Sequence, residues 1–271
     1  MNGILFDHRL NLCGFNLPLH FENLYQILIV LRGHIVYTVE ENSYDMAERS
    51  IVVLNTMENH FLKVLEYPYE RVIIRLDPSY FFDEVKAPEL MGLFIQRSKG
   101  FRHKLDVSDE AWEVIHECIS SIEKEYNSQK SLSELIVGAE IRKLFVHIHR
   151  GMKIEDNLPS SIVSTVGRAM NYMNMHFKEK LRVEEIANIA MVSKDHLSHI
   201  FSKTTGKSIK QYLIDLRINH AKFLLSETEK SISEIAEDCG YEDMNFFSRQ
   251  FRNEEEISPS EFRKIIRNQL Q

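Results

Sequence analysis

Asparagine and arginine side chains four residues apart near the C-terminus have the chemistry to read DNA bases. Asn245 and Arg249 fall on one predicted exposed helix face. An asparagine amide can pair with adenine, and an arginine guanidinium can make two hydrogen bonds to guanine. Fifty residues earlier the same positions hold Asp195 and His199, with Ser198 beside them. These residue types indicate two base-reading surfaces.

Both surfaces belong to a repeated unit. Leu197 matches Phe247, Phe201 matches Phe251, Ser208 matches Ser258, Tyr212 matches Phe262, and Glu185-Ile186-Ala187 recurs as Glu234-Ile235-Ala236. A repeat of this length built from short helices is typical of paired helix-turn-helix motifs. In such a motif the second helix lies in the major groove, and its first residues reach base edges. Double-stranded DNA is therefore the predicted partner.

Capping residues predict where the helices of each unit begin. Ser193 can cap the second helix of the first unit, whereas Ser231-Ile232-Ser233-Glu234 is a capping box that begins the second unit. The outward residues are then Lys194, Asp195, Ser198, His199 and Lys203 in the first unit and Met244, Asn245, Ser248, Arg249 and Arg252 in the second. Among them, Lys194, Lys203 and Arg252 are suited to phosphates.

A helix beginning at Ser208, with a capping box that ends at Gln211, is predicted between the two units. One continuous helix would hold the two reading surfaces at a fixed separation. Two surfaces that enter successive major grooves must lie about 34 Å apart. We therefore expect one chain to cover an asymmetric site of about 20 base pairs.

Charge alone would not indicate DNA binding. The chain of 271 residues has a net charge of −7, but residues 160–271 hold 16 basic and 16 acidic side chains, so the acidic excess belongs to the first 159 residues. No apolar run approaches the roughly 20 residues that span a bilayer, and the N-terminus lacks a signal core. A cytoplasmic protein without membrane association is expected.

Residues 17–82 are predicted to be β structure. Runs rich in branched and aromatic residues cover 25–31, 35–39, 51–54 and 71–76, with turn-like segments at 32–34 and 41–43. Short strands at this spacing suggest a small barrel or sandwich. The fold class is therefore multidomain α+β, with an N-terminal β-barrel or jelly roll and a C-terminal all-α domain.

Two amphipathic helices are predicted between these domains. Ala111, Ile115 and Ile119 lie on one apolar stripe, and a second helix is expected from Ser131. Its apolar residues are Leu135, Ile136, Ala139, Ile141, Leu144, Phe145 and Ile148. Such a pair commonly forms a dimer interface, although it can also cover the open face of the β domain. The expected domains are 1–105 for sensing, 106–150 for dimerisation, 151–161 as linker and 162–271 for DNA binding.

The C-terminal residues resemble the AraC/XylS family of bacterial transcription regulators. The resemblance covers about 162–266 and rests on an ordered set of motifs: Ile186-Ala187, Phe201 with Gly206, Arg217 with Ala221, Cys239-Gly240-Tyr241, Phe247-Ser248-Arg249 and Ser258-Pro259-Ser260-Glu261-Phe262. The family usually has glycine in the turn before the last Ser-Pro. This chain keeps Gly206 in the first unit but has Glu256 in the second, where glutamate resists a left-handed backbone.

The β region resembles the cupin-like sensory domain of many such regulators, through Leu31-Arg32-Gly33 and 51–60. This resemblance implies a small-molecule effector, such as a sugar or a related metabolite, with Arg32, Tyr37, Glu58 and His60 as candidate contacts. The turn usual before the third strand, glycine-aspartate-hydrophobic, reads Arg49-Ser50-Ile51 here. No two histidines have the His-x-His spacing of a metal cupin, so neither a metal nor another cofactor is expected.

Three functions remain in competition at this level. The first is an effector-responsive transcription regulator that forms a homodimer and can contact RNA polymerase. The second is a DNA-binding regulator whose barrel binds no small molecule and serves dimerisation or protein docking. The third, an enzyme, is not expected, because Cys13 and Cys118 lack the paired spacing of a metal-tuned reactive thiol.

Overall fold

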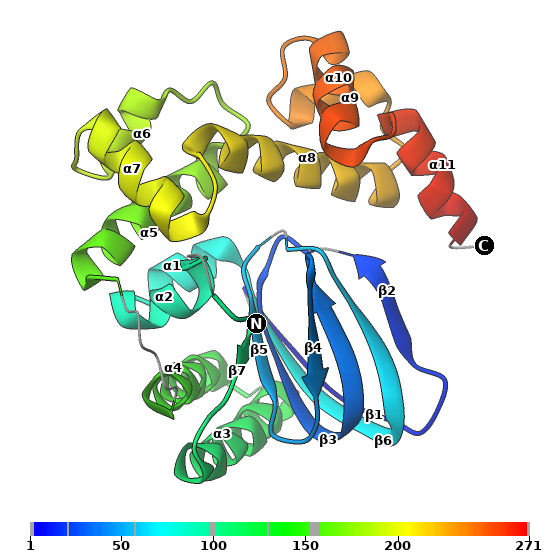
Figure 1. Ribbon diagram of the computed structural model, residues 1–271, viewed down its shortest axis with the longest axis vertical. Helices are drawn as coiled ribbons and strands as arrows, with labels where there is room; N and C mark the ends of the chain where they lie inside the picture. Colours follow the sequence, from blue (N-terminus) through cyan, green and yellow to red (C-terminus); the bar gives the residue numbers. More distant parts are fainter. Residues whose placement is uncertain are drawn as a thin grey trace. The chain divides into compact units, whose positions relative to one another are not determined.

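The computed structural model describes residues 3–20, 22–56, 58–97, 101–128, 130–151 and 158–269. The chain divides into two compact units, one of Met1–Gly167 with Thr204–Gly206 and the other of Arg168–Lys203 with Lys207–Gln271. The first unit contains an antiparallel sheet and helices, and the second is all helical (Figure 1). The predicted multidomain α+β fold is thus confirmed. Most of the predicted linker, residues 152–157, lies outside the described residues.

Seven strands form the sheet of the first unit. They are β1 (Ile4–Asn11), β2 (Asn16–His20), β3 (Tyr25–Val39), β4 (Asn42–Met46), β5 (Ile51–Leu54), β6 (His60–Leu76) and β7 (Lys104–Leu105). Their order is β1-β6-β3-β5-β7, with β2 paired to β6 and β4 paired to β3. All of these pairs are antiparallel.

The two long strands bend where they pass each other. Between Val30 and Ile35 the register of β3 against β6 shifts, and Gly33 has φ +92°. A Cβ atom at Gly33 would lie 2.7 Å from the carbonyl oxygen of Pro68, so only glycine fits this approach. The prediction of two strands separated by a turn at 32–34 is therefore wrong, because the segment is a bulge within one bent strand.

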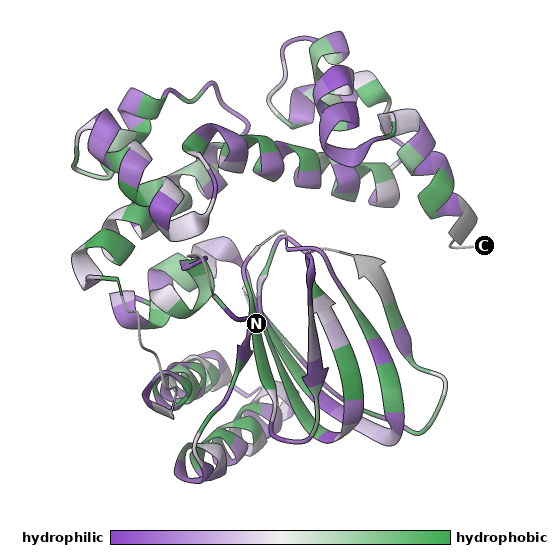
Figure 2. Cartoon of the chain, viewed as in Figure 1, coloured by the Kyte–Doolittle hydropathy of each residue, from purple (hydrophilic) through white to green (hydrophobic). Residues whose placement is uncertain are grey.

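The bend brings the two halves of the sheet face to face. The core cluster of the unit joins Leu28 and Val30 from one half of β3 to Tyr37 and Val39 from the other. Hydrophobic residues dominate both halves of β3 (Figure 2). On the opposite face of β3, Tyr25 stacks on Phe81 with ring centroids 4.1 Å apart. The sheet is consequently buried on both faces at this strand.

Four helices complete the first unit: α1 (Pro78–Glu84), α2 (Pro88–Ile95), α3 (Asp109–Ser128) and α4 (Ser133–Gly151). The predicted stripe of α3 is buried, with Ile115 and Ile119 at 0% and 3% exposure. In α4 the predicted stripe is confirmed for Ile141, Leu144, Phe145 and Ile148, which are buried, but it is wrong at the start of the helix. Leu135 and Ile136 are exposed, and the helix begins at Ser133 after Leu132 adopts φ +68°, so no capping box forms at Ser131.

Helices build the second unit. They are α5 (Ser160–His176), which begins in the first unit, α6 (Val183–Ile189), α7 (Lys194–Thr205), α8 (Ile209–Glu227), α9 (Ile232–Asp238), α10 (Met244–Glu255) and α11 (Pro259–Gln269). Ile235, Cys239, Phe247 and Phe251 form a buried core with α8. No helix among the described segments is long and apolar enough to cross a bilayer.

Candidate DNA interface and effector-binding interior

The fifty-residue repeat of the sequence is also a repeat of helices. α7 and α10 each have twelve residues and begin at Lys194 and Met244. The Ser193 hydroxyl accepts a hydrogen bond from the amide of His196 at 3.3 Å, as predicted. At α10 the cap is Asp243, whose carboxylate accepts from the amides of Asn245 at 2.6 Å and Phe246 at 2.9 Å. Both helices thus begin at a fixed residue with a polar cap.

Buried aromatic pairs hold both helices in the same way. The rings of Phe201 and Tyr212 lie 5.6 Å apart at 73°, and those of Phe251 and Phe262 lie 5.6 Å apart at 76°. After each helix the backbone enters the left-handed region, with φ +73° at Gly206 and +62° at Glu256. The predicted conflict between a glutamate side chain and a left-handed backbone is therefore present at Glu256.

The two units also share the start of the following helix. The side chains of Ser208 and Ser258 accept from the amides three residues later, Gln211 at 3.1 Å and Glu261 at 3.3 Å. The Ser258 amide donates back to the Glu261 carboxylate, which completes a capping box there. At Ser208 only the first half of the predicted box forms, because the Gln211 amide group donates to Asp215 and Glu254 instead.

The predicted outward residues of α10 are mostly free. Asn245, Arg249 and Arg252 are exposed, and their side chains make no hydrogen bond or ion pair within the described part of the chain. Met244 is also exposed, at 44%, whereas Ser248 is half-buried. This helix therefore presents one amide and two guanidinium groups to solvent.

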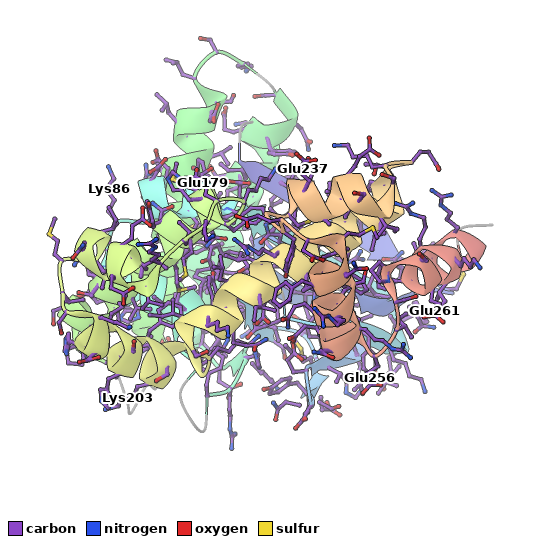
Figure 3. The ribbon with its side chains drawn as sticks, turned by 90° about the horizontal axis from the view of Figure 1, so that it is seen from above. Lys86, Glu179, Lys203, Glu237, Glu256 and Glu261 are labelled. Atoms are coloured by element: carbon purple, nitrogen blue, oxygen red, sulfur yellow. The ribbon has the colours of Figure 1, made fainter. Side chains whose placement is uncertain are left out.

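On α7 the outward residues are less available. Asp195, Ser198, His199 and Lys203 are exposed, and Figure 3 labels Lys203. The Ser198 hydroxyl, however, donates to the backbone carbonyl of its own helix at 2.8 Å. Lys194 forms an ion pair with Glu184 of α6 at 2.7 Å. The Ser198 hydroxyl and the Lys194 ammonium group must each release its partner within the protein before it can bind DNA.

The acidic run at the end of α10 is largely occupied within the unit. Glu254 accepts from Gln211 and Gln250, and Glu255 pairs with Lys222 at 2.8 Å. Only Glu256, labelled in Figure 3, has no such partner within the described residues. The repulsion of DNA by this run is accordingly smaller than the sequence suggests.

Sequence reasoning missed Phe246, which is 51% exposed beside Asn245. An aromatic residue one position before the buried Phe247 is more typical of a core than of a DNA-binding surface. The repeat contained the signal, because Phe246 corresponds to His196, which is also exposed. An apolar ring at this position can contact a thymine methyl group.

The predicted effector residues do not form one cluster. Tyr37 and His60 lie together in the interior, with ring centroids 5.8 Å apart, and the Tyr37 hydroxyl accepts from the Gln26 amide at 3.2 Å. Arg32 is exposed at the bend of β3, opposite Glu70 of β6. Glu58 lies in a separate ionic cluster.

That cluster is a buried and fully paired carboxylate. Glu58 accepts hydrogen bonds from the Arg97 guanidinium and from His103, whose other ring nitrogen lies 3.0 Å from the Tyr44 hydroxyl. Burial opposes ionisation of Glu58, but the charge and hydrogen bonds of Arg97 hold its pKa well below the usual range. This satisfied arrangement has the properties of a structural cluster.

Among the described residues no group of three or more His, Cys, Asp and Glu side chains could hold a metal ion. Cys118 and Cys239 are buried, and burial raises the pKa of both thiols to about 12. A protonated buried thiol packs as a small apolar group.

Comparisons with known proteins agree with both halves of the molecule. Residues 8–165 match the AraC-like ligand binding domain family, and residues 186–265 match a helix-turn-helix domain family. The Msm operon regulatory protein of Streptococcus mutans is 26% identical over 258 residues, covering 94% of this chain and 89% of that protein. The HTH-type transcriptional activator RhaR of Escherichia coli is 23% identical over 255 residues, covering 91% and 86%.

Among solved structures, ToxT from Vibrio cholerae has the same overall fold. The structure of ToxT bound to (E)-4-(8-methylnaphthalen-1-yl)but-3-enoic acid has a TM-score of 0.55 at 14% identity, covering 98% of this chain and 100% of ToxT. Because the ligand-binding family matches more than half of the chain and the helix-turn-helix family follows it, the chain belongs to the AraC family of DNA-binding transcription regulators.

Proposed function

We propose that this regulator binds an asymmetric DNA site of about 20 base pairs, with α7 and α10 in successive major grooves. The supporting observation is that the two helices, Lys194–Thr205 and Met244–Glu255, have the same length and begin at equivalent positions of the fifty-residue repeat. They are joined by α8, a single helix of 19 residues that is about 28 Å long. A helix of that length suits the separation of successive major grooves.

In this proposal α10 supplies most of the sequence reading. Asn245 pairs with adenine, Arg249 pairs with guanine, and Met244 and Ser248 flank them. On α7, Asp195, Ser198 and His199 make single hydrogen bonds. Lys194, Lys203 and Arg252 bind phosphates, which sets the register without reading sequence.

Sequencing the DNA fragments that the protein retains in the cell tests this proposal. We expect one asymmetric motif of about two helical turns, whose two halves differ in sequence. A palindromic motif with identical half-sites would contradict it, because that pattern requires one reading helix from each of two chains.

The interior of the first unit is proposed to bind a small-molecule effector. Buried polar groups beside an apolar core, such as Gln26 and Tyr37, are typical of ligand sites. Sugars, which the resemblance of the sequence implies, belong among the first compounds to test. A bound compound raises the melting temperature by mass action.

The alternative is a β unit that binds no small molecule and serves dimerisation or protein docking. An effector panel that leaves the melting temperature unchanged, while DNA binding remains intact, would favour it. This outcome would contradict the sensing role but not the DNA-binding role.

The same chain is proposed to form a homodimer through α3 and α4. Leu135 and Ile136 are 67% and 44% exposed in the first turn of α4, on the side opposite its buried stripe, and Leu132, just before the helix, is 69% exposed. A contiguous apolar surface on a helix is typical of a partner site. Replacing Leu135 with lysine is expected to give monomers in light scattering, whereas Leu10→Lys, at an exposed leucine of β1 outside both helices, leaves the dimer intact.

The proposed domains are 1–105 for sensing, 106–150 for dimerisation, 151–161 as linker and 162–271 for DNA binding. The protein acts in the cytoplasm, without catalytic activity, and RNA polymerase is a candidate partner on DNA. Co-retention of purified polymerase by protein bound to its DNA site tests that partner.

A further inference from the structure

Alternate residues of β6 present polar groups to the interior of the first unit. Tyr69 and Ile73 belong to the core cluster, so Arg71, which lies between them in the strand, faces the same side. Its neighbours across the sheet are Arg9 of β1 and Val30 of β3. A guanidinium group therefore lies inside the unit.

The guanidinium of Arg71 is buried with few partners. Its side chain is 5% exposed, and it donates one hydrogen bond, to the Asn11 side chain at 2.9 Å. The nearest carboxylate oxygen, of Asp7, is 3.8 Å away. A guanidinium has five N–H donors, and a buried charge is costly unless it is paired. Most donors of Arg71 thus lack an acceptor within the described residues.

The neighbouring phenol has the same deficiency. The hydroxyl of Tyr69 is fully buried and makes no hydrogen bond within the described residues. Its ring centroid lies 5.6 Å from the guanidinium carbon of Arg71. Burial raises the pKa of Tyr69, so the hydroxyl remains a donor at neutral pH. The buried Tyr69 hydroxyl, left unpaired in this way, calls for an acceptor.

We propose that Arg71 and Tyr69 hold the carboxylate of an organic monocarboxylic acid, which is the effector of this regulator. The inference rests on the proposed effector site and names its ligand class. A carboxylate accepts two parallel hydrogen bonds from a guanidinium and can accept a third from a phenol. Sugars lack the negative charge that a buried guanidinium favours.

Local charges favour a single negative charge on the ligand. Arg75, the next interior arginine of β6, is already paired with Glu22 and donates to Gln26. Arg9 and Arg71 share one carboxylate, that of Asp7. One positive charge therefore remains to be neutralised, which matches one carboxylate.

The walls of the site require an apolar body on the ligand. Val30, Ile35 and Val64 belong to the same buried cluster as Tyr69. The ring of Phe15, in the loop between β1 and β2, covers Arg71 with its centroid 4.4 Å from the guanidinium carbon. An aliphatic or aromatic chain of the ligand can take the place of the Phe15 ring. It would then contact the guanidinium on one side and the apolar residues on the other.

Calorimetric titration of the full-length protein tests the proposal. The probes are a series of straight-chain monocarboxylates from acetate to oleate together with benzoate and phenylacetate. Each is paired with its primary amide, which has the same shape but no charge. We expect at least one acid to bind, and its amide to bind at least about a hundredfold more weakly, because the charge-assisted bonds are lost.

Two variants locate the bound acid. Tyr69→Phe is expected to weaken binding about tenfold, and Arg71→Gln about a hundredfold or more. Tyr25→Phe is the matched control, because Tyr25 is equally buried on the opposite face of β3. It should leave the affinity for the acid unchanged. Melting curves of each variant identify any loss of fold.

Three results would overturn the inference. They are equal binding of an acid and its amide, an affinity that neither Tyr69→Phe nor Arg71→Gln changes, and no binding by any acid of the series. If a sugar or another neutral compound binds instead, the sensing role survives and only the ligand class is wrong. If no compound of either class binds, sensing and ligand class both fail.

Discussion

The outward residues of α7 and α10 differ in charge, although both helices share one buried scaffold. Where α10 carries Asn245 and Arg249, α7 carries Asp195 and His199. An arginine makes two hydrogen bonds to guanine in fixed geometry, whereas a neutral histidine makes one. The carboxylate of Asp195 also repels phosphates. At the level of residues, we therefore expect α10 to be the stronger reader.

Replacing Arg249 with alanine tests this difference. We expect the affinity for the preferred DNA site to fall by about 1–3 kcal/mol, which is roughly tenfold to a hundredfold, and selectivity for one guanine to be lost. Fluorescence anisotropy with matched and substituted sites measures both effects. His199→Ala, at the equivalent position of α7, should cost less. An equal loss in the two variants would contradict the asymmetry.

The backbone at Glu256 gives a prediction about stability. Its φ of +62° is left-handed, which costs a residue with a side chain about 1 kcal/mol or more relative to glycine. Glu256→Gly is therefore expected to stabilise the second unit by about 1 kcal/mol in denaturant unfolding. Glu254→Gly, within the last turns of α10, should destabilise it instead. A gain in both variants would show that removal of acidic charge is responsible.

At the level of elements, one histidine joins a strand to a helix. The two ring nitrogens of His8 in β1 lie 2.9 Å from carboxylate oxygens of Glu70 in β6 and Glu123 in α3. Only a protonated ring can donate to both carboxylates. Burial lowers the pKa of His8, but its two carboxylate partners outweigh burial and raise the pKa above the ordinary value of 6.5.

Stability of the first unit should therefore depend on pH through His8. Because the native pKa is raised, the stabilisation is fully present below about pH 6.5 and is lost as pH rises through the native pKa. Melting temperatures between pH 5.5 and 8.5 should fall more steeply for the wild type than for His8→Gln. His116→Gln, exposed on α3, should follow the wild type. Parallel curves for all three proteins would exclude a stabilising role of protonated His8.

The sequence predicted the repeated elements well, for physical reasons. The caps at Ser193 and Ser231 and the buried pair Phe247 and Phe251 act locally, within one or two helical turns, so their pattern is visible in the chain. α10 began at a cap that was not predicted, Asp243. Local patterns thus fix helix positions closely but do not identify every cap.

Long-range geometry was harder to predict. β1 was missed because polar side chains lie on both of its faces, so apolar and polar residues do not alternate along it. One of these side chains, His8, binds two carboxylates rather than solvent. The exposed Leu135 and Ile136 were grouped on one face with residues of α4 that are buried, since periodicity alone does not say which apolar side meets the core. Arg71 and Tyr69 were overlooked as a site because only the sheet register places them together.

At the scale of the whole molecule, the rigid connection by α8 predicts a strict spacing. Insertion of five base pairs between the two half-sites should lower the affinity to that of a single unit, since the second helix would face away from its groove. Insertion of ten should not restore it, because one helix of 19 residues cannot lengthen by about 34 Å. Gel-shift titrations of the three DNA duplexes measure this. Recovery with ten base pairs would indicate a flexible connection.

The fixed order of α7, α8 and α10 gives the bound protein a direction along the double helix. A palindromic site looks the same after inversion, but a site read by two unlike helices in one chain does not. Reversing such a site in front of a gene turns the other end of the regulator toward the promoter. The orientation of the operator is therefore information in its own right, separate from its sequence and its distance from the start of transcription.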